Sequence, residues 1–134
     1  METKKAILIV DDEFIILESL RAQLGRFLDE EIILEAASSG EESIEIIDYC
    51  FQNNIDLQVI ISDYNLEDMK GTDLLALAHE KFPSSKKMIL TGQADLDKIA
   101  DFKSKIGLEE CFSKPWGFEH LKQTVMSAFN PQSN

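Results

Sequence analysis

The chain has 134 residues, 44% of them hydrophobic, which suits one domain of ordinary size with a core of its own. Thirteen basic residues against 25 acidic ones give a net charge of −12, and such a surface repels phosphate backbones, which argues against direct binding of nucleic acid. No apolar stretch reaches the length of about 18 residues that a membrane span requires.

Short apolar runs separate longer helical patterns along the whole chain. The first run, KAILIV, is apolar without interruption from Ala6, which is typical of a strand buried on both faces. Four later runs have similar character. The predicted strands are residues 6–10, 31–36, 57–62, 87–91 and 110–113.

Helical periodicity follows each predicted strand. Leucines and phenylalanines recur at three- and four-residue steps over residues 14–28, so one face of that helix is apolar. Ser39 followed by Glu42 is a capping-box pattern that begins the second helix. The third helix ends before Pro83. The remaining helices are predicted over residues 95–105, with weak amphipathicity, and 118–129.

Five strand–helix units with short connections predict an α/β fold in which a doubly wound parallel sheet carries helices on both faces. We expect one domain over residues 1–130 and a frayed tail over 131–134. In such sheets, binding sites form beyond the carboxyl ends of the strands. The residues directly after each strand are therefore the candidates for function.

Acidic residues follow two of these strands. Asp11 and Asp12 come after the first strand and Asp63 after the third. If these strands are neighbours, three carboxylates converge, which destabilises the fold unless a cation neutralises them. Mg²⁺ fits such a site because it is held by a few oxygens and retains water for a phosphate ligand.

Two further side chains complete a phosphate-binding pattern. Thr91, followed by the small residue Gly92, comes after the fourth strand, and Lys114 comes after the fifth. A hydroxyl can donate to a phosphoryl oxygen, and an ammonium can pair with phosphate charge. Together with the carboxylates, they suit phosphoryl transfer to a carboxylate nucleophile.

Each of these residues also has an ordinary structural interpretation. The Asp11–Asp12 pair could open a helix, Asp63 could be a turn aspartate, and Thr91 could be a cap or turn residue. A single Lys-Pro pair carries little information. Only the joint placement after four strands favours function.

Four segments together resemble the receiver domains of bacterial two-component response regulators. These are ILIVDDE at 7–13, IISDYNLEDMKGTDLL at 60–75, MILTGQA at 88–94 and FSKPW at 112–116. The resemblance implies a flavodoxin-like strand order 2-1-3-4-5, as in the chemotaxis regulator fold. It also implies a phosphoacceptor domain of a phosphorelay, which is an enzyme only in promoting its own phosphotransfer and dephosphorylation.

The resemblance assigns the acceptor and its metal ligands. Asp63 would take the phosphoryl group from a sensor histidine kinase, a histidine phosphotransfer protein or a small phosphodonor. Asp12, Asp63 and the backbone carbonyl of Asn65 would bind Mg²⁺, and Asp11 would act mainly through water.

The same resemblance assigns the residues around the phosphoryl group. Thr91 and Lys114 would bind its oxygens, and the Lys114–Pro115 peptide bond is expected to be cis. Gly71 is expected where the backbone needs a conformation that only glycine adopts easily. An effector domain or protein would lie downstream.

The sequence departs from the family pattern at several positions. Glu67 replaces the usual proline of the acceptor loop, which should loosen that loop. Cys111 stands where the family has an aromatic switch residue, and Phe112, one position later, should face the opposite side of its strand. Asn65 and Gln93, both neutral amides, flank the acceptor and predict an intermediate lifetime for the acyl phosphate.

The remaining polar residues are assigned to structure. We interpret His79 and His120 as partly exposed helix residues, and the aromatic pair in KPWGF as packing residues. Cys50 and Cys111 show no zinc-binding pattern, and Cys50 is predicted to be buried. With no recognisable export signal, reduced thiols and a cytoplasmic location are expected.

Two alternative functions remain open, as does a homodimer. A receiver-like interaction module that signals without phosphate is favoured mildly by Cys111 but disfavoured by the intact set of site residues. A phosphatase with an aspartyl nucleophile would need a second acid two residues after Asp63, where this chain has Asn65.

Overall fold

A parallel sheet of five strands forms the centre of the protein, in the order β2-β1-β3-β4-β5. The computed structural model describes residues 3–92, 95–100 and 106–129. The strands are β1 (Lys5–Val10), β2 (Ile33–Ala37), β3 (Asp56–Asp63), β4 (Lys86–Thr91) and β5 (Leu108–Ser113). The strand order and the parallel pairing confirm the doubly wound, flavodoxin-like fold predicted from the sequence.

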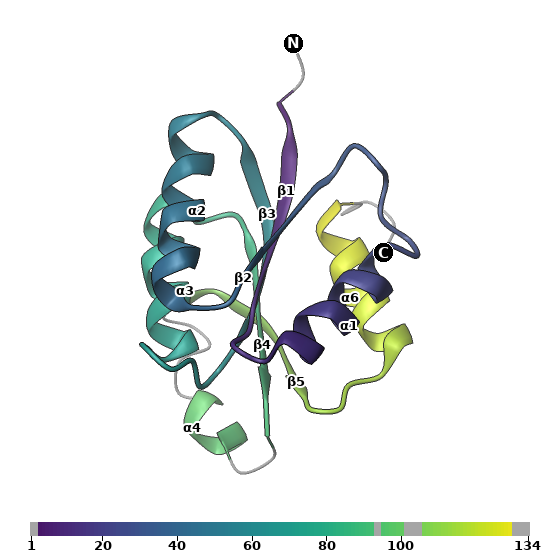
Figure 1. Ribbon diagram of the computed structural model, residues 1–134, viewed down its shortest axis with the longest axis vertical. Helices are drawn as coiled ribbons and strands as arrows, with labels where there is room; N and C mark the ends of the chain where they lie inside the picture. Colours follow the sequence, from purple (N-terminus) through teal and green to yellow (C-terminus); the bar gives the residue numbers. More distant parts are fainter. Residues whose placement is uncertain (1–2, 93–94, 101–105, 130–134) are drawn as a thin grey trace.

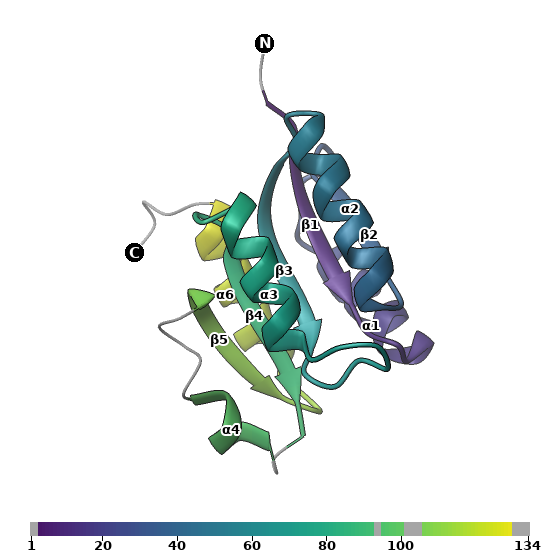
Figure 2. The same cartoon turned by 90° about the vertical axis from the view of Figure 1, so that its left-hand side faces the viewer.

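Helices cover both faces of this sheet (Figure 1). They are α1 (Phe14–Leu24), α2 (Gly40–Gln52), α3 (Gly71–Lys81), α4 (Leu96–Ala100) and α6 (Phe118–Phe129). Helices α1 and α6 pack on one face, and α2 and α3 on the other (Figures 1 and 2). Within the described ranges, none of the helices combines the length and the hydrophobicity needed to cross a bilayer.

The alternation of side chains along the strands divides the core into two halves. Ile7 and Ile9 of β1 face α1 and α6, whereas Leu8 and Val10 face α2 and α3, and all four are 0% exposed. Burial on both faces explains why the strands are apolar without alternation. The sheet is therefore a rigid platform that fixes the residues at its carboxyl edge.

Several predicted element boundaries need correction. The first helix ends at Leu24 rather than at residue 28, because Gly25 caps it and the chain continues as turns. Phe27 and Leu28 nevertheless pack against the core, which is why their spacing resembled a longer helix. The second strand is 33–37 rather than 31–36. The helix expected over 95–105 is described as α4, and part of that range lies outside the described residues.

The capping pattern at the start of α2 is confirmed in part. Ser39 is the N-cap, and its hydroxyl accepts from the Glu42 N–H. The Glu42 carboxylate, however, accepts from the N–H of Ser38 instead of that of Ser39. The box thus closes one residue earlier than the capping-box pattern predicts.

Candidate phosphoacceptor site

The register of the sheet brings the predicted acidic residues together. The pairing of β1 with β3 ends at Val10 and Ser62, so Asp11 and Asp63 occupy the next positions of adjacent strands. The pairing of β4 with β5 ends at Thr91 and Ser113, so Lys114 follows directly. Strand neighbours, rather than sequence neighbours, assemble the site.

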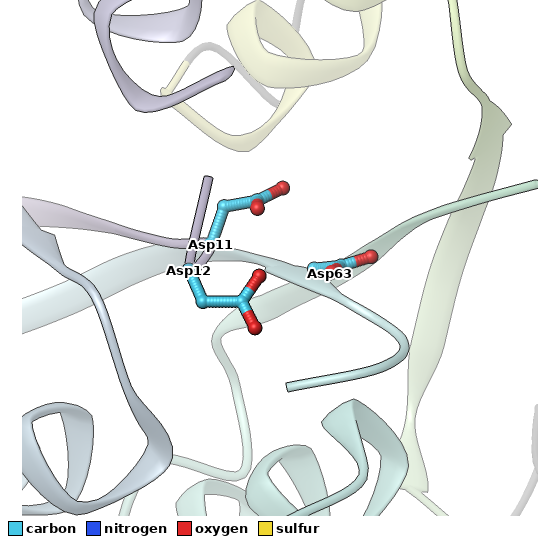
Figure 3. Close-up of side chains that lie close together, drawn as sticks. All are labelled: Asp11, Asp12 and Asp63. Atoms are coloured by element: carbon cyan, nitrogen blue, oxygen red, sulfur yellow. The ribbon is translucent and has the colours of Figure 1, made fainter. Parts of the chain in front are cut away.

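The three carboxylates lie side by side at the carboxyl edge (Figure 3). One oxygen each from Asp11, Asp12 and Asp63 lie within 4.8 Å of one another. A cluster of carboxylate oxygens at this spacing is a donor set that suits a hard divalent cation. The residues present therefore fit Mg²⁺.

Lys114 joins two of these carboxylates. Its Nζ lies 2.9 Å from Asp11 Oδ2 and 3.2 Å from Asp63 Oδ1, and Glu13 Oε2 is 3.9 Å away. The Lys114 N–H donates to Thr91 O, which ties the end of β5 to the end of β4. The Lys114–Pro115 peptide bond is cis, as predicted.

Asp11 is engaged by the protein through both of its carboxylate oxygens. Oδ1 accepts from the Glu13 N–H at 2.8 Å, and Oδ2 accepts from Lys114. Asp11 is also 0% exposed. Asp11 is thus held by the protein itself, whereas no hydrogen bond to the Asp12 carboxylate is recorded among the described residues.

Burial changes the acid–base properties of the pair at the centre. Burial and the neighbouring Asp11 raise the pKa of Asp63, against the opposing effect of Lys114 and of the Asn65 N–H, which donates to the Asp63 carboxylate. For Lys114, burial lowers the pKa, but hydrogen bonds and attraction to Asp11 and Asp63 outweigh it, so the pKa is raised overall. Lys114 is therefore held in its charged form.

Thr91, the last residue of β4, has a hydroxyl without a hydrogen-bond partner among the described residues. The residue is 1% exposed, and its Oγ1 is buried with no hydrogen bond among the described residues. Buried polar atoms are nearly always hydrogen-bonded. A helix cap would require such a bond, so the unpartnered hydroxyl gives no support to a capping role for Thr91.

Gly71 is required for a different reason from the one predicted. Its φ is not positive, since the only positive-φ glycine in the described part of the chain is Gly107. A Cβ at Gly71 would instead collide with the carbonyl oxygen of Asp63. Close approach of α3 to the acceptor, and not backbone conformation, excludes a side chain here.

Some of the remaining predictions are confirmed, and one falls on a residue that the structure does not describe. Cys50 is buried, and Phe112 faces the α1–α6 half of the core while Cys111 packs toward the other half, as strand alternation predicts. His79 is half-buried, whereas His120 is exposed and lies against the Phe112 ring. Gln93 lies outside the described residues.

Sequence reasoning missed the residues that hold the acceptor loop. Asp68 accepts from the N–H groups of Gly40 and Glu41 at the start of α2, and Asn65 donates to Asp95 at the start of α4. The partners are separated by about 30 residues in sequence in each case. No local pattern in the sequence signals such contacts.

The sequence of this chain matches a known protein family over most of its length. The family model of the response regulator receiver domain matches residues 7–126. The chain belongs to this family. Receiver domains are signalling modules that typically bind Mg²⁺ and work with kinases and output effectors, and the acidic cluster of this receiver domain fits that pattern.

Individual relatives agree with the family assignment. The hydrogenase transcriptional regulatory protein HoxA of Cupriavidus necator is 29% identical over 133 residues, which cover 98% of this chain and 26% of that protein. The receiver domain therefore spans about a quarter of the length of this curated relative.

Solved structures match over nearly the full length of both chains. A response regulator receiver domain protein from Clostridium thermocellum has a TM-score of 0.79 at 30% identity and covers 96% of each chain. The signal receiver domain of an HD domain-containing protein from Pseudomonas fluorescens Pf-5 has a TM-score of 0.80 at 27% identity, with 96% and 97% covered.

Proposed function

We propose that this receiver domain is the phosphoacceptor of a two-component phosphorelay, phosphorylated on Asp63 in a Mg²⁺-dependent reaction. The observation that carries the proposal is the set of groups at the carboxyl edge around Asp63. The Lys114 ammonium lies 3.2 Å from its carboxylate, and Thr91, at the end of the adjacent strand β4, has a buried hydroxyl without a partner among the described residues. A cation and an unused donor beside a buried carboxylate are what an incoming phosphoryl group requires.

The Asp63 carboxylate is the proposed nucleophile. One of its oxygens attacks the phosphorus of a phosphohistidine or of a small acyl phosphate, so that a new P–O bond forms as the P–N or P–O bond of the donor breaks. The leaving group keeps the electron pair and takes up a proton from solvent if it needs one. The attacking form is the carboxylate, and Lys114 favours that form.

The neighbouring residues would stabilise the charge on the transferred group. Lys114 would pair with one phosphoryl oxygen, and the Thr91 hydroxyl would donate to another. Asp12, Asp63 and the Asn65 backbone carbonyl would hold Mg²⁺, with Asp11 acting mainly through water. Bound Mg²⁺ would supply positive charge against the phosphoryl oxygens.

The donor would be a sensor histidine kinase or a histidine phosphotransfer protein, and an effector domain or protein would respond. Whole-protein activities such as the transcriptional regulation named for HoxA belong to much longer chains. A cytoplasmic location is proposed together with these partners, because the chain belongs to a family of signalling modules that exchange a phosphoryl group with kinases. We infer no enzymatic activity beyond self-phosphotransfer and autodephosphorylation.

Intact-mass measurement after incubation with Mg²⁺ and acetyl phosphate tests this function. We expect the mass to increase by one phosphoryl group in the native protein, and this increase to be lost in Asp63→Ala. Asp56→Ala, at the opposite end of the same strand, is the matched control and should still be phosphorylated. If no acyl donor phosphorylates the native protein, the phosphate-independent interaction module becomes the better description.

A further inference from the structure

A row of side chains crosses from the acceptor loop to α4 beside the phosphoacceptor pocket. Lys70 Nζ donates to Asn65 Oδ1, and Asn65 Nδ2 donates to Asp95 Oδ2 at 3.0 Å. Asp95 Oδ1 in turn lies 3.4 Å from Lys98 Nζ. Two segments 30 residues apart are thereby joined by side chains of alternating charge around one neutral amide.

The charges on either side fix the orientation of the Asn65 amide. A cation faces its oxygen and an anion faces its nitrogen, so a flipped amide would place like partial charges together at both ends. The Asn65 backbone N–H meanwhile donates to the Asp63 carboxylate. Asn65 therefore contacts the acceptor through its backbone and α4 through its side chain.

Asp95 is also linked to the carboxyl end of β4. Its N–H donates to Gly92 O at 3.2 Å, directly after Thr91. Its side chain is only 21% exposed, and Ile99, one helical turn further on, is 1% exposed in the core. A displacement at either Asn65 or Thr91 would thus reach α4 through Asp95.

We propose that Asp95 is a positioning residue that holds α4 to the acceptor loop in the unphosphorylated protein and releases it on phosphorylation. The inference rests on the proposed function of Asp63. A phosphoryl group there adds negative charge to the residue next but one to Asn65 and would compete with the Asp95 carboxylate for the Asn65 amide. The bridge then weakens, and α4 responds although Cys111 replaces the aromatic residue of the family.

Backbone amide NMR with Mg²⁺ and beryllofluoride, a phosphoryl mimic, tests this coupling. In the native protein, we expect the amide signals of Asp63 and Thr91 to shift, and those of Ile99 and Ala100 to shift with them. In Asp95→Ala, the pocket signals should still shift, but the α4 signals should already be displaced and should change little further. Asp97→Ala removes an exposed acid from the same helix and should behave as the native protein does.

Exchanging the donor and the acceptor of the Asn65–Asp95 hydrogen bond distinguishes the loss of this bond from general effects of mutation. Asn65→Asp alone sets two carboxylates against each other and should abolish the α4 response. Asn65→Asp combined with Asp95→Asn restores a donor–acceptor pair and should recover the response, measured at saturating Mg²⁺ and beryllofluoride. Recovery of the response with the pair is not expected from a purely structural role for either residue.

The outcomes distinguish the two proposals. An unchanged α4 response in Asp95→Ala, or an exchange variant no better than Asn65→Asp, would overturn the coupling and leave the phosphoacceptor function intact. The absence of any shift at Asp63 and Thr91 in the native protein would overturn the proposed function, and the coupling with it.

Discussion

At the scale of single residues, the side chains at the carboxyl edge of the sheet include more carboxylates than cations. Three carboxylates meet, and Lys114 is the cation that contacts two of them. The raised pKa of Asp63 means that the folded state binds this proton more tightly than the unfolded chain does. The free energy of unfolding therefore falls as the pH rises from the ordinary carboxyl range through the raised pKa, and the ionised site is a cost at neutral pH.

Binding of Mg²⁺ should offset the destabilising effect of the ionised Asp63. At a hundredfold excess over its dissociation constant, a ligand of the native state alone stabilises by about 2.7 kcal/mol. We expect calorimetry to show a higher melting temperature with Mg²⁺, and Asp63→Asn to melt higher than the native protein in EDTA but to gain little from Mg²⁺. An Asp63→Asn variant that is less stable than the native protein in EDTA would contradict this account.

Lys87 is a second buried charge, remote from the acceptor site. It is 0% exposed, and its Nζ donates to the carbonyl oxygens of Phe82 and Ser85, each at 3.0 Å. Burial, with a smaller effect of Lys86, lowers its pKa to about 8. The unfolded chain therefore binds this proton more tightly between pH 8 and the ordinary lysine range.

The stability of the native protein should consequently rise with pH across that window relative to Lys87→Met. Because one pKa unit corresponds to about 1.4 kcal/mol, the relative gain is at most about 3 kcal/mol. Urea unfolding at pH 7, 8.5 and 10 measures it, and subtraction of the variant removes the contributions of other titrating groups. A difference in the free energy of unfolding between the two proteins that stays constant over this pH range would show that the pKa of Lys87 is not lowered in the folded protein.

At the scale of elements, the loop between β3 and α3 is restrained by its neighbours. Asp68 accepts from the Gly40 and Glu41 N–H groups at 2.9 and 2.8 Å, and these bonds lower the pKa of its carboxyl. Met69 lies so close to Gly40 that a Cβ there would collide with its side chain. The looser loop expected from Glu67 stays a prediction, but these contacts show what holds the loop in place.

Asp68→Ala should weaken Mg²⁺ binding although Asp68 is not proposed as a ligand. Loss of the Asp68 hydrogen bonds to α2 leaves the loop that carries Asn65 less ordered. Substitution of residues that support metal ligands typically lowers metal affinity by roughly tenfold or more. Isothermal titration with Mg²⁺ measures this effect. Glu67→Ala, an exposed acid of the same loop, is the matched control and should bind Mg²⁺ nearly as the native protein does.

At the scale of the whole molecule, exposed apolar side chains follow the acidic residues at the carboxyl end of β1. Phe14 and Ile15, in the first turn of α1, are 71% and 79% exposed, and only Glu13 separates them from Asp11 and Asp12. Apolar side chains on a surface next to a reactive group are typical of a docking site for a protein partner. A kinase or phosphotransfer protein that presents its phosphohistidine to Asp63 would contact them.

Ile15→Asp should therefore slow phosphotransfer from a phosphorylated histidine phosphotransfer protein while phosphorylation by acetyl phosphate continues at the native rate. We expect a loss of roughly tenfold or more, as for a central interface residue. Radiolabel transfer measures the first reaction and intact mass the second. Leu77→Asp, an exposed apolar position on α3, should affect neither; equal loss with both donors would instead indicate damage to the pocket.

Much of this protein follows from local sequence alone. Continuous apolar runs predicted the buried strands, three- and four-residue periodicity predicted the helices, and polar residues directly after strands predicted where the site lies. The strand and helix inferences succeed because strand burial and helix amphipathicity are set by residues close together in the chain. The first helix was predicted four residues too long because Phe27 and Leu28 keep the spacing of a buried face after the helix has ended.

The tertiary structure decided everything that depends on residues distant in sequence. Only the pairing of β1 with β3, of β3 with β4 and of β4 with β5 brings Lys114 within reach of Asp11 and Asp63. Only the packing of α3 explains Gly71. The tethers of Asp68 to α2 and of Asn65 to Asp95 have no sequence signature, because each joins groups about 30 residues apart. Chemical type can be read along the chain, whereas distance and burial, which determine reactivity, arise only when the strands are placed side by side.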